Sequence, residues 1–537
     1  MKRIITAIFI FVTLLASFHQ TYAQQHDRHW IGGYGWPGTP GDDAVLMVFG
    51  EDGITYTEFH SEIYIVNGAF AISNAEGELQ FYTNGNVAAS WDHQVMQGGK
   101  GFNEGASSDD FGVNGMDTTL NYFYNPYTYQ VIPDAYDENI YYMVHAFILE
   151  YGDCQHLDMP KMQISKIDMS ANGGKGRVVY KNRPFAEGLY GRGFALVRHG
   201  NGRDWWVVLR NHEGQEYRAL LLQRDSVVRD VVSNIPGLDM DISSFDDCFV
   251  TSTSLLEPSP DGSLLIDKYG ANWAKLMTFD RCSGEVALVD TFANGITPLV
   301  TSGGVVINTP VESFQFSASG RYLYGAGYAE IAQWDLWADD IGASKIQLGG
   351  VPWALSDSQE VMVGITGGLS AFGLGPDGKI YNLYRTAHSM IKHPDEPGEA
   401  SGYCIAADSP PSCLSVPYWL FSNRHPNFRL GPLEGSGCDT LLSSTKPPLS
   451  NSGYGVSASP TVASGQVEVG ITLPRYGGGS AEIQVVDMLG RVLHYHRFPP
   501  YAYLHILEVG GWPPGLYNVV LLENGRARAS ARLVVGR

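Results

Sequence analysis

Residues 251–270 read TSTSLLEPSPDGSLLIDKYG, and this stretch decides the fold. Two apolar runs, Leu255-Leu256 and Leu264-Leu265-Ile266, flank the turn Pro260-Asp261-Gly262. Asp tolerates and Gly readily supplies the positive φ angles that a tight connection needs. The stretch therefore predicts a strand, a turn and a second strand, which together form a β-hairpin.

The same turn recurs along the chain at a fixed interval. The glycines Gly262, Gly320 and Gly378 are separated by 58 residues each time. Further turns at about the same interval upstream are expected at Gly202, at Asp137-Glu138-Asn139 and at Gly77. A constant period of this length indicates one supersecondary unit used repeatedly, and each unit has room for about four short strands.

Such repeated sheets predict a β-propeller, because a four-stranded sheet cannot cover both of its faces alone, whereas a ring of sheets covers them all. The propeller is expected over residues 24–441, with six or seven blades. The strands near 30–34 and 45–49 are expected to combine with residues near 418–422 into a closing or seventh blade. A linear β-solenoid is the alternative, although its repeats are usually much shorter.

The first 23 residues have the pattern of a secretory signal peptide. Lys2 and Arg3 precede an apolar run that is short for a membrane span, and a small-residue site predicts cleavage between Ala23 and Gln24. An uncleaved anchor is the alternative. Because no cysteine occurs before Cys154, a lipid-modified N-terminal cysteine is excluded.

The charge balance is strongly acidic. Without the signal peptide, 33 basic residues face 56 acidic residues, which gives a formal charge of −23. This argues against nucleic acid or an anionic membrane surface as partners. No further apolar run is long enough to span a bilayer, so the mature chain is expected to have no transmembrane segment.

The cysteines are few for a chain of this length, so disulfides reinforce the fold without replacing its core. A pair within Cys404, Cys413 and Cys438 is preferred, because all three lie in one loop-rich stretch. A pair of Cys248 with Cys282 is disfavoured, because these residues would lie at opposite ends of one blade. The spacing leaves the connectivity open.

The propeller region resembles a family of secreted propellers of Bacteroidetes that is related to the YVTN and WD40-like propellers. The resemblance is carried by FAISNAEGELQFYTNGNVAASWDHQVMQGGKG at 70–101, by the later SPDG and LGPDGKIY turns, and by the closing run SNRHPNFRLGPLEGSGCDT at 422–440. It covers nearly all of residues 30–441. The family implies a fold and an extracytoplasmic compartment, and it brings no established catalytic residues.

Residues 442–455 are rich in Ser, Pro and Gly and are typical of an interdomain linker. After them, residues 456–537 contain about six short alternating runs at the spacing of a small Ig-like antiparallel β-sandwich.

This C-terminal part resembles the type A sorting domain of proteins exported by the type IX secretion system. The matching positions are Asp487, Gly490 and Arg491 in an Asp-x-x-Gly-Arg hairpin, and Pro514, Gly515 and Tyr517 in a Pro-Gly-x-Tyr turn. The resemblance implies export across the outer membrane and the type IX machinery as a partner. An Ig-like module without a sorting role is the alternative.

Catalytic motifs are missing from the sequence. The Ser370 region has one residue too many between serine and glycine for a nucleophile elbow, and His212-Glu213 lacks the second histidine of a zinc protease. The run 33–38 satisfies G-x-G-x-x-G, but no strand, helix or downstream acid accompanies it. No cofactor is expected.

Acidic clusters are the main candidate metal ligands, although a propeller can also gather ligands from several blades at its central channel. Asp239, Asp241, Asp246 and Asp247 could supply oxygen ligands to Ca²⁺, although the glycine and the terminal glutamate of an EF-hand are absent. The loop with Asp109, Asp110 and Asp117 has the same ambiguity, and a solvated loop is the preferred interpretation of both. The scattered histidines His93, His145, His199, His388 and His425 are expected to be structural.

Aromatic residues are frequent, and inter-blade packing is the preferred role for each tryptophan, with an exposed binding rim as the alternative. Taken together, the sequence favours a non-catalytic binding or adhesion protein at the cell surface, with an unknown surface protein or glycan as its ligand. Two alternatives are a metal-dependent propeller hydrolase of the lactonase or phytase kind and a scaffold subunit of a surface or gliding apparatus.

Overall fold

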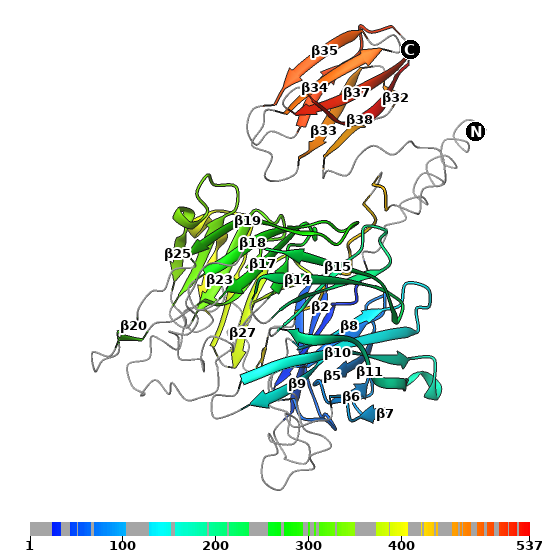
Figure 1. Ribbon diagram of the computed structural model, residues 1–537, viewed down its shortest axis with the longest axis vertical. Coiled ribbons are helices and arrows are strands. Elements are labelled where there is room, and N and C mark those ends of the chain that lie inside the picture. Colours follow the sequence, from blue (N-terminus) through cyan, green and yellow to red (C-terminus); the bar gives the residue numbers. More distant parts are fainter. Residues whose placement is uncertain are drawn as a thin grey trace, which may run out of the picture. The chain divides into compact units, whose positions relative to one another are not determined.

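The chain divides into two compact units, which are described separately: Met1–Arg198 with Asp204–Leu430, and His199–Arg203 with Gly431–Arg537. The structure is a computed structural model (Figure 1). It describes residues 24–33, 43–50, 52–65, 69–103, 128–151, 156–190, 193–211, 214–235, 256–269, 273–293, 299–300, 306–307, 311–327, 330–349, 372–385, 387–405, 420–421, 424–433, 436–438, 454–459, 462–463, 465–473, 481–487, 491–498, 504–513, 515–523 and 526–536.

The first unit is a β-propeller, and its described residues form seven successive blades whose own strands are antiparallel. A parallel pairing of Gln97 with Arg177 joins blades two and three into one eight-stranded sheet. Blades one to four are β1 (His29–Gly33), β2 (Ala44–Gly50) and β3 (Gly53–Phe59); β4 (Phe70–Ser73), β5 (Leu79–Thr83), β6 (Val87–Ser90) and β7 (Val95–Lys100); β8 (Tyr129–Pro133), β9 (Ile140–Tyr151), β10 (His156–Asp168) and β11 (Arg177–Tyr190); and β12 (Ala195–Arg198), β13 (Trp205–Arg210), β14 (Glu216–Gln223) and β15 (Ser226–Asn234).

Blades five to seven are β16 (Leu256–Pro258), β17 (Leu264–Tyr269), β18 (Trp273–Phe279) and β19 (Val286–Ala293); β22 (Val311–Phe316), β23 (Tyr322–Gly327), β24 (Ile331–Asp335) and β25 (Ile346–Gly349); and β26 (Phe372–Leu374), β27 (Ile380–Arg385), β28 (Ala387–Ile391) and β29 (Tyr403–Ile405). Short additions are the ladder of β20 (Leu299–Val300) with β21 (Val306–Ile307) and the 3₁₀ turns Asn172–Gly174, Gly342–Ser344 and Gly398–Ser401.

The predicted turns are confirmed as the connections between the first and second strands of the blades. In blade five, the Ser259 amide donates to the Leu264 carbonyl at 2.9 Å and the Gly262 amide donates to the Ser259 carbonyl at 2.8 Å, and blade six repeats both bonds. The turn glycines all have positive φ angles, at Gly77 (86°), Gly202 (70°), Gly262 (70°), Gly320 (70°) and Gly378 (77°). Glycine is therefore required by the backbone conformation at these sites.

The first strand of each blade is the innermost one. First strands of neighbouring blades lie beside one another, as β1 does with β4 and β22 with β26. They are buried along their length, for example β4 and β12, whereas the fourth strand β15 is largely exposed. The third strands β10, β14, β18 and β24 each have a fourth strand on their outer side.

Apolar side chains between blades close the ring. Separate buried clusters join blades one and two, two to four, four and five, five and six, and six and seven. The last cluster joins blade seven to blade one, where the ring of Trp30 lies 5.7 Å from that of Tyr381 and 5.0 Å from that of Phe49. Every blade therefore has both faces covered.

The expected closing strand is paired differently from the prediction. Residues near 418–422 were expected to complete the N-terminal strands, but β30 (Leu420–Phe421) hydrogen-bonds with β27 of the last blade and only lies beside β1. The N-terminal strands instead form a three-stranded blade of their own, with β2 between β1 and β3.

The second unit contains a β-sandwich. One sheet has the order β31 (Gly455–Ser459), β33 (Gln466–Thr472) and β36 (Leu504–Glu508); the other has the order β32 (Val462–Ala463), β38 (Arg526–Val535), β37 (Gly515–Glu523), β34 (Ala481–Asp487) and β35 (Val492–Arg497). Alternate residues of both sheets, such as Val467, Val469, Ile483 and Val519, form one buried core. The pairing is antiparallel except between β32 and β38, which are parallel.

We expect Gly262→Ala to lower the free energy of unfolding by about 2–4 kcal/mol. Alanine is unfavourable in the left-handed backbone conformation of this residue, and its Cβ would also clash with a neighbouring side chain. A Cβ at this position would lie 2.8 Å from Cγ1 of Val197. Gly378→Ala is the matched control, since Gly378 has the same turn conformation with no atom within 4 Å, and a loss of about 1–2 kcal/mol is expected. Urea denaturation measures both, and equal losses would contradict the packing argument.

We also expect His145 to make the propeller sensitive to acid. His145 is fully buried, donates from Nδ1 to Asn103 Oδ1 at 2.5 Å and accepts from Ser165 Oγ at 2.9 Å, and burial lowers its pKa to about 3. Below pH 6.5 this ring is protonated in the unfolded chain, whereas in the folded chain it stays neutral. Stability is therefore lost as the pH falls from 6.5 towards 3, by up to about 1.4 kcal/mol per pH unit.

Urea midpoints between pH 7 and pH 4.5 test this expectation. The midpoint of His145→Gln should fall less steeply than that of the wild type, whereas His60→Gln, at an exposed site, should leave the slope unchanged. An unchanged slope in His145→Gln would show that other groups cause the acid sensitivity.

Candidate functional site

Residues 424–430, named here the axial segment, cross the centre of the propeller. Arg424 forms an ion pair with Glu257 of the innermost strand β16, and its Nη2 donates to the Phe314 carbonyl of β22 at 3.4 Å. His425 Nε2 donates to the Ala71 carbonyl of β4 at 2.7 Å. These contacts reach the innermost strands of blades two, five and six, so the segment occupies the propeller axis.

The rest of the axial segment is fixed by further contacts. Asn427 Nδ2 donates to the Pro260 carbonyl at 2.6 Å, in the turn of blade five. Arg429 donates to both carboxylate oxygens of Asp27, at 2.5 and 2.7 Å, in the bidentate geometry that favours strong pairing. Phe428 is buried, with its ring centroid 6.0 Å from that of Trp205.

A pocket lies where the axial segment meets blades three, four and five. It is small: the volume open to the centre of a water-sized molecule is about 30 Å³. The lining residues are Gln130, Gly193, Phe194, Ala195, Leu196, Leu256, Glu257, Pro258, Arg424, His425 and Pro426. The wall is therefore mainly apolar, with four polar side chains that converge from β8, β16 and the axial segment.

The charged groups of the pocket neutralise each other. Burial raises the pKa of Glu257, while the neighbouring Arg424 opposes this rise, and the two side chains are 15% and 11% exposed. Burial also lowers the pKa of His425, so its ring is neutral at pH 7. The pocket consequently presents a paired carboxylate and guanidinium together with neutral polar atoms.

Two of these neutral atoms are buried acceptors without a donor. His425 Nδ1 and Gln130 Oε1 have no hydrogen-bond partner within the part of the chain that the structure describes. A buried acceptor without a donor destabilises a protein by about 1–3 kcal/mol. Because both atoms are enclosed by the protein, this cost belongs to the fold of the axis.

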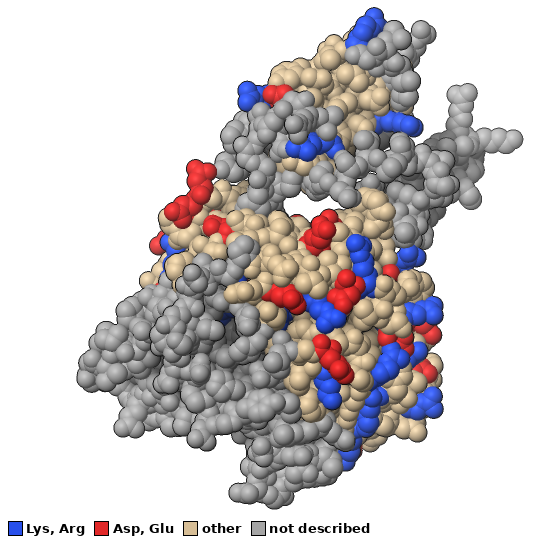
Figure 2. Space-filling view, in the orientation of Figure 1, with Lys and Arg blue, Asp and Glu red and all other residues tan. Residues whose placement is uncertain are grey.

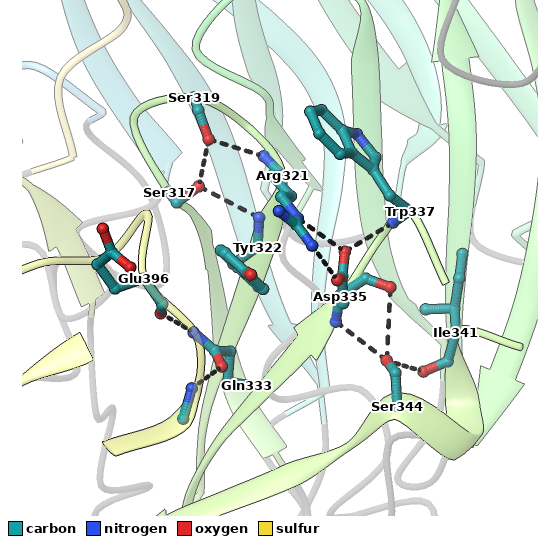
Figure 3. A network of polar contacts seen from close by, with 11 residues as sticks. Ser317, Ser319, Arg321, Tyr322, Gln333, Asp335, Trp337, Ile341, Ser344 and Glu396 are labelled. Carbon is teal, nitrogen blue, oxygen red and sulfur yellow. Dashed lines mark hydrogen bonds and ion pairs between the residues drawn. The ribbon is translucent and has the colours of Figure 1, made fainter. Parts of the chain in front are cut away.

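A second polar network lies in blade six and reaches the segment after β28 (Figure 3). Arg321 donates to both oxygens of Asp335, at 3.3 and 2.8 Å, and the Trp337 amide donates to Asp335 Oδ1 at 2.9 Å. Gln333 donates to the Glu396 carbonyl at 2.8 Å. These groups bond one another, so the network joins blades six and seven and serves the structure.

The predicted metal ligands are not tested by the structure. Asp239, Asp241, Asp246 and Asp247 lie outside the described residues, as do Asp109, Asp110 and Asp117. Within the described ranges, no group of three or more His, Cys, Asp or Glu side chains could hold a metal ion. A calcium site at the aspartates therefore stays a prediction.

The residues of the sorting motif are partly described. Asp487 ends β34, Arg491 is exposed just before β35, and Gly515 begins β37, whereas Gly490 and Pro514 lie outside the described residues. Tyr517 is buried, and its hydroxyl donates to the Pro513 carbonyl at 2.6 Å. Ala23 also lies outside the described part, which begins at Gln24.

The predicted structural roles of several histidines and tryptophans agree with the packing. His145 is a buried hydrogen-bonded residue, and His93 stacks on Phe59 at 3.9 Å. Trp205, Trp206 and Trp334 are buried between blades. Trp353, Tyr418 and Trp419, candidates for an exposed rim, lie outside the described residues.

The sequence did not single out Gln130, Glu257 or Arg424 as site residues, and it treated His425 as one of several scattered histidines. Only local sequence features could have pointed to these residues. Glu257 is a charged residue that directly follows Leu256 in an innermost strand, and Arg424-His425 follows the last strand in an acidic chain. Only the folded ring brings these positions together.

The surface has a mixed charge. In Figure 2, Lys and Arg lie among Asp and Glu over the described part of the propeller face that is in view. Among the described residues, no helix is long and apolar enough to cross a membrane.

Comparisons with known proteins identify no family, because no protein-family model and no curated protein matches the chain. The chain is similar to the extracellular domain of a putative hybrid two-component system from B. thetaiotaomicron, with a TM-score of 0.34 and 10% identity over 95% of this chain and 56% of that domain. It thus spans little more than half the length of that domain.

Two further solved structures are similar in part. The Swd1 β-propeller domain of Myceliophteria thermophila has a TM-score of 0.31 and 9% identity, over 68% of this chain and 90% of that one. A gluconolactonase from Xanthomonas campestris has a TM-score of 0.26 and 10% identity, over 57% of this chain and 85% of that one. The propeller assignment rests on strand order and inter-blade packing, because all three TM-scores are low.

We expect Glu257→Gln to lower the free energy of unfolding by about 3–5 kcal/mol, because it leaves the Arg424 guanidinium buried without its counter-charge. The double variant Glu257→Leu/Arg424→Met should recover most of this loss, since it removes both charges. Thermal and urea denaturation measure the effect.

The control for this prediction is Lys379→Met. It breaks an ion pair with Asp377 whose partners are 39% and 27% exposed, and we expect a change below about 1 kcal/mol. A loss in Glu257→Gln as small as that of the control would contradict the role of the axial ion pair.

Proposed function

We propose that this protein is a secreted binding protein of the cell surface, in which the propeller is the binding head and the C-terminal sandwich is a type IX sorting domain. The observation that carries the proposal is the axial segment. It fills the axis, where propeller enzymes gather their catalytic groups, with a chain whose charged side chains are engaged in ion pairs. The small pocket beside it is lined mainly by apolar side chains.

The structure of the second unit supports the sorting role. The positions that match the sorting motif lie at the β34–β35 hairpin and at the start of β37, where Asp487 pairs with Tyr517 across the strands. Tyr517 fixes the preceding turn through Pro513 and packs near Trp512 at 5.2 Å between ring centroids. A compact unit of this kind can be recognised independently of the propeller.

The cysteines support an oxidising compartment. Cys282, Cys404 and Cys438 are disulfide-bonded, and the other three cysteines lie outside the described residues. Disulfides persist in periplasmic and extracellular proteins and are rare in the cytosol. Together with a signal peptide cleaved after Ala23, this supports export through the periplasm and then across the outer membrane.

The partners that follow from this proposal are the type IX machinery, through the sorting domain, and a surface protein or glycan, through the propeller. The net negative charge disfavours nucleic acid. Binding is proposed without chemical conversion of the ligand.

We expect a chain that ends at Tyr454 to accumulate in the periplasm, because it keeps the signal peptide and the propeller but lacks the sorting domain. Cell fractionation and surface labelling in the native host measure this outcome, with the full chain as the control. Resistance of the periplasmic form to proteolysis would show that the propeller is folded.

A second control is a substitution in the sandwich away from the motif positions. Ile506→Thr changes an exposed side chain of β36 and should leave export largely intact. Surface display of the truncated chain at the level of the full chain would refute the sorting role.

A further inference from the structure

Three histidines, named here the histidine cluster, lie together at one edge of the C-terminal sandwich. His494 and His496 are on β35, the last strand of the five-stranded sheet, and His505 is on β36, the last strand of the three-stranded sheet. In the described part of the chain no backbone ladder joins these two strands, because they belong to different sheets. The contact between the strands therefore depends on their side chains.

The histidine cluster faces the interior of the sandwich. Each member is opposite a fully buried apolar residue of the neighbouring strand: His494 opposite Val485, His496 opposite Ile483, and His505 opposite Val469. Directly opposite residues of an antiparallel pair lie on the same face of the sheet. The three rings, each partly exposed, consequently cover the apolar core where the two sheets end.

The rings of the cluster contact each other closely. His494 Nε2 and His505 Nε2 are hydrogen-bonded at 3.0 Å, so one of these nitrogens donates its proton and the other accepts with a lone pair. His505 also stacks on His496, with 3.7 Å between ring centroids and 16° between ring planes. The ring of Phe498 lies 4.9 Å from that of His496 on the same edge. This arrangement needs at least one neutral ring in the bonded pair.

No described carboxylate side chain of β33 to β36 faces the histidine cluster. Side chains alternate between the two faces of a strand. The described charged or titratable groups of these strands outside the cluster all occupy the outward positions: Glu468, Glu482, Tyr495, Arg497 and Glu508. Two of the carboxylates have other partners, since Glu482 lies 3.7 Å from Arg497 and Glu508 accepts from Gln466 at 2.6 Å. A proton on the cluster therefore gains no counter-charge from these groups.

We propose that the histidine cluster is a pH-sensitive switch, which keeps this edge of the sandwich closed at neutral pH and opens it in mildly acidic solution. A proton on the accepting nitrogen leaves two N–H groups facing each other, so the hydrogen bond between β35 and β36 is lost. Protonation of a second ring adds repulsion between like charges in contact. The switch does not depend on the proposed sorting role.

The direction of the pH effect follows from proton linkage. Burial, together with the charge of the neighbouring histidines, holds the pKa of His494 and of His505 below the ordinary value of 6.5. When the edge is open and solvated, both rings ionise near that ordinary value. The open state then binds more protons, so the closed state loses stability as the pH falls below about 6.5.

Hydrogen exchange of the mature full chain, followed by mass spectrometry at pH 7.5 and pH 5.0, tests the switch. Protection factors remove the intrinsic pH dependence of amide exchange. We expect protection of β35 and β36 to fall at least tenfold at pH 5.0, while β37 in the same sandwich changes less than about twofold. Equal protection of β35 and β36 at both pH values, or an equal fall in all three strands, would overturn the proposal.

The decisive variant is His505→Phe. Phenylalanine keeps a flat ring against His496 but takes up no proton, and its face tolerates a neighbouring imidazolium through a cation–π contact. Protection of β35 and β36 should then change less than about threefold between the two pH values. Protection of β37 at the wild-type level at pH 7.5 shows that the variant is folded. His505→Gln, which retains a hydrogen-bonding group and has no bulky ring, should give the same result.

Glu468→Gln is the matched control. Glu468 is an exposed carboxylate on β33, directly opposite β36, and it also titrates in the acidic range. This variant should keep the full loss of protection at pH 5.0. A wild-type response in both His505 variants, or loss of the response in Glu468→Gln, would show that other groups open this edge and would refute the switch.

Discussion

The structure depends on one constraint: a small antiparallel sheet with apolar side chains on both faces is stable only when other sheets cover both faces. Each blade meets this constraint by packing against its neighbours, and the last gap is closed by Trp30, Phe49 and Tyr381. The N-terminal blade and the last blade thus depend on each other. Closure by side chains, more than by backbone pairing, explains why β30 can bind β27 while β1 to β3 form a separate sheet.

The sequence predicted those features whose causes are local. A positive φ angle at Gly262 depends on four consecutive residues, and its recurrence at a fixed interval was enough to predict the propeller, its turns and its four-stranded units. Strand alternation likewise predicted the six main strands of the sandwich. The hairpin that decides the fold also contains Glu257, but nothing local distinguishes this residue as a partner of the axis.

The axial site could not be predicted because its causes are distant in sequence. Arg424 and Glu257 are 167 residues apart, and Ala71 lies 354 residues before His425. Their proximity follows from the closure of the ring, and no spacing rule describes it. The structure explains why the axial segment is polar. The innermost strands direct backbone carbonyls, such as those of Ala71 and Phe314, towards the axis, and these carbonyls need hydrogen-bond donors.

The pair of Arg429 with Asp27 joins residues 402 positions apart, so the two ends of the propeller sequence are tied at one point. A chain that emerges from its N-terminus cannot complete this contact, nor fill the axis, until almost the whole propeller has been delivered. Non-local contacts of this kind slow folding. The contacts that close the propeller therefore depend on its C-terminal segment, and a chain shortened before residue 424 would lack both the filling of the axis and this tie between its ends.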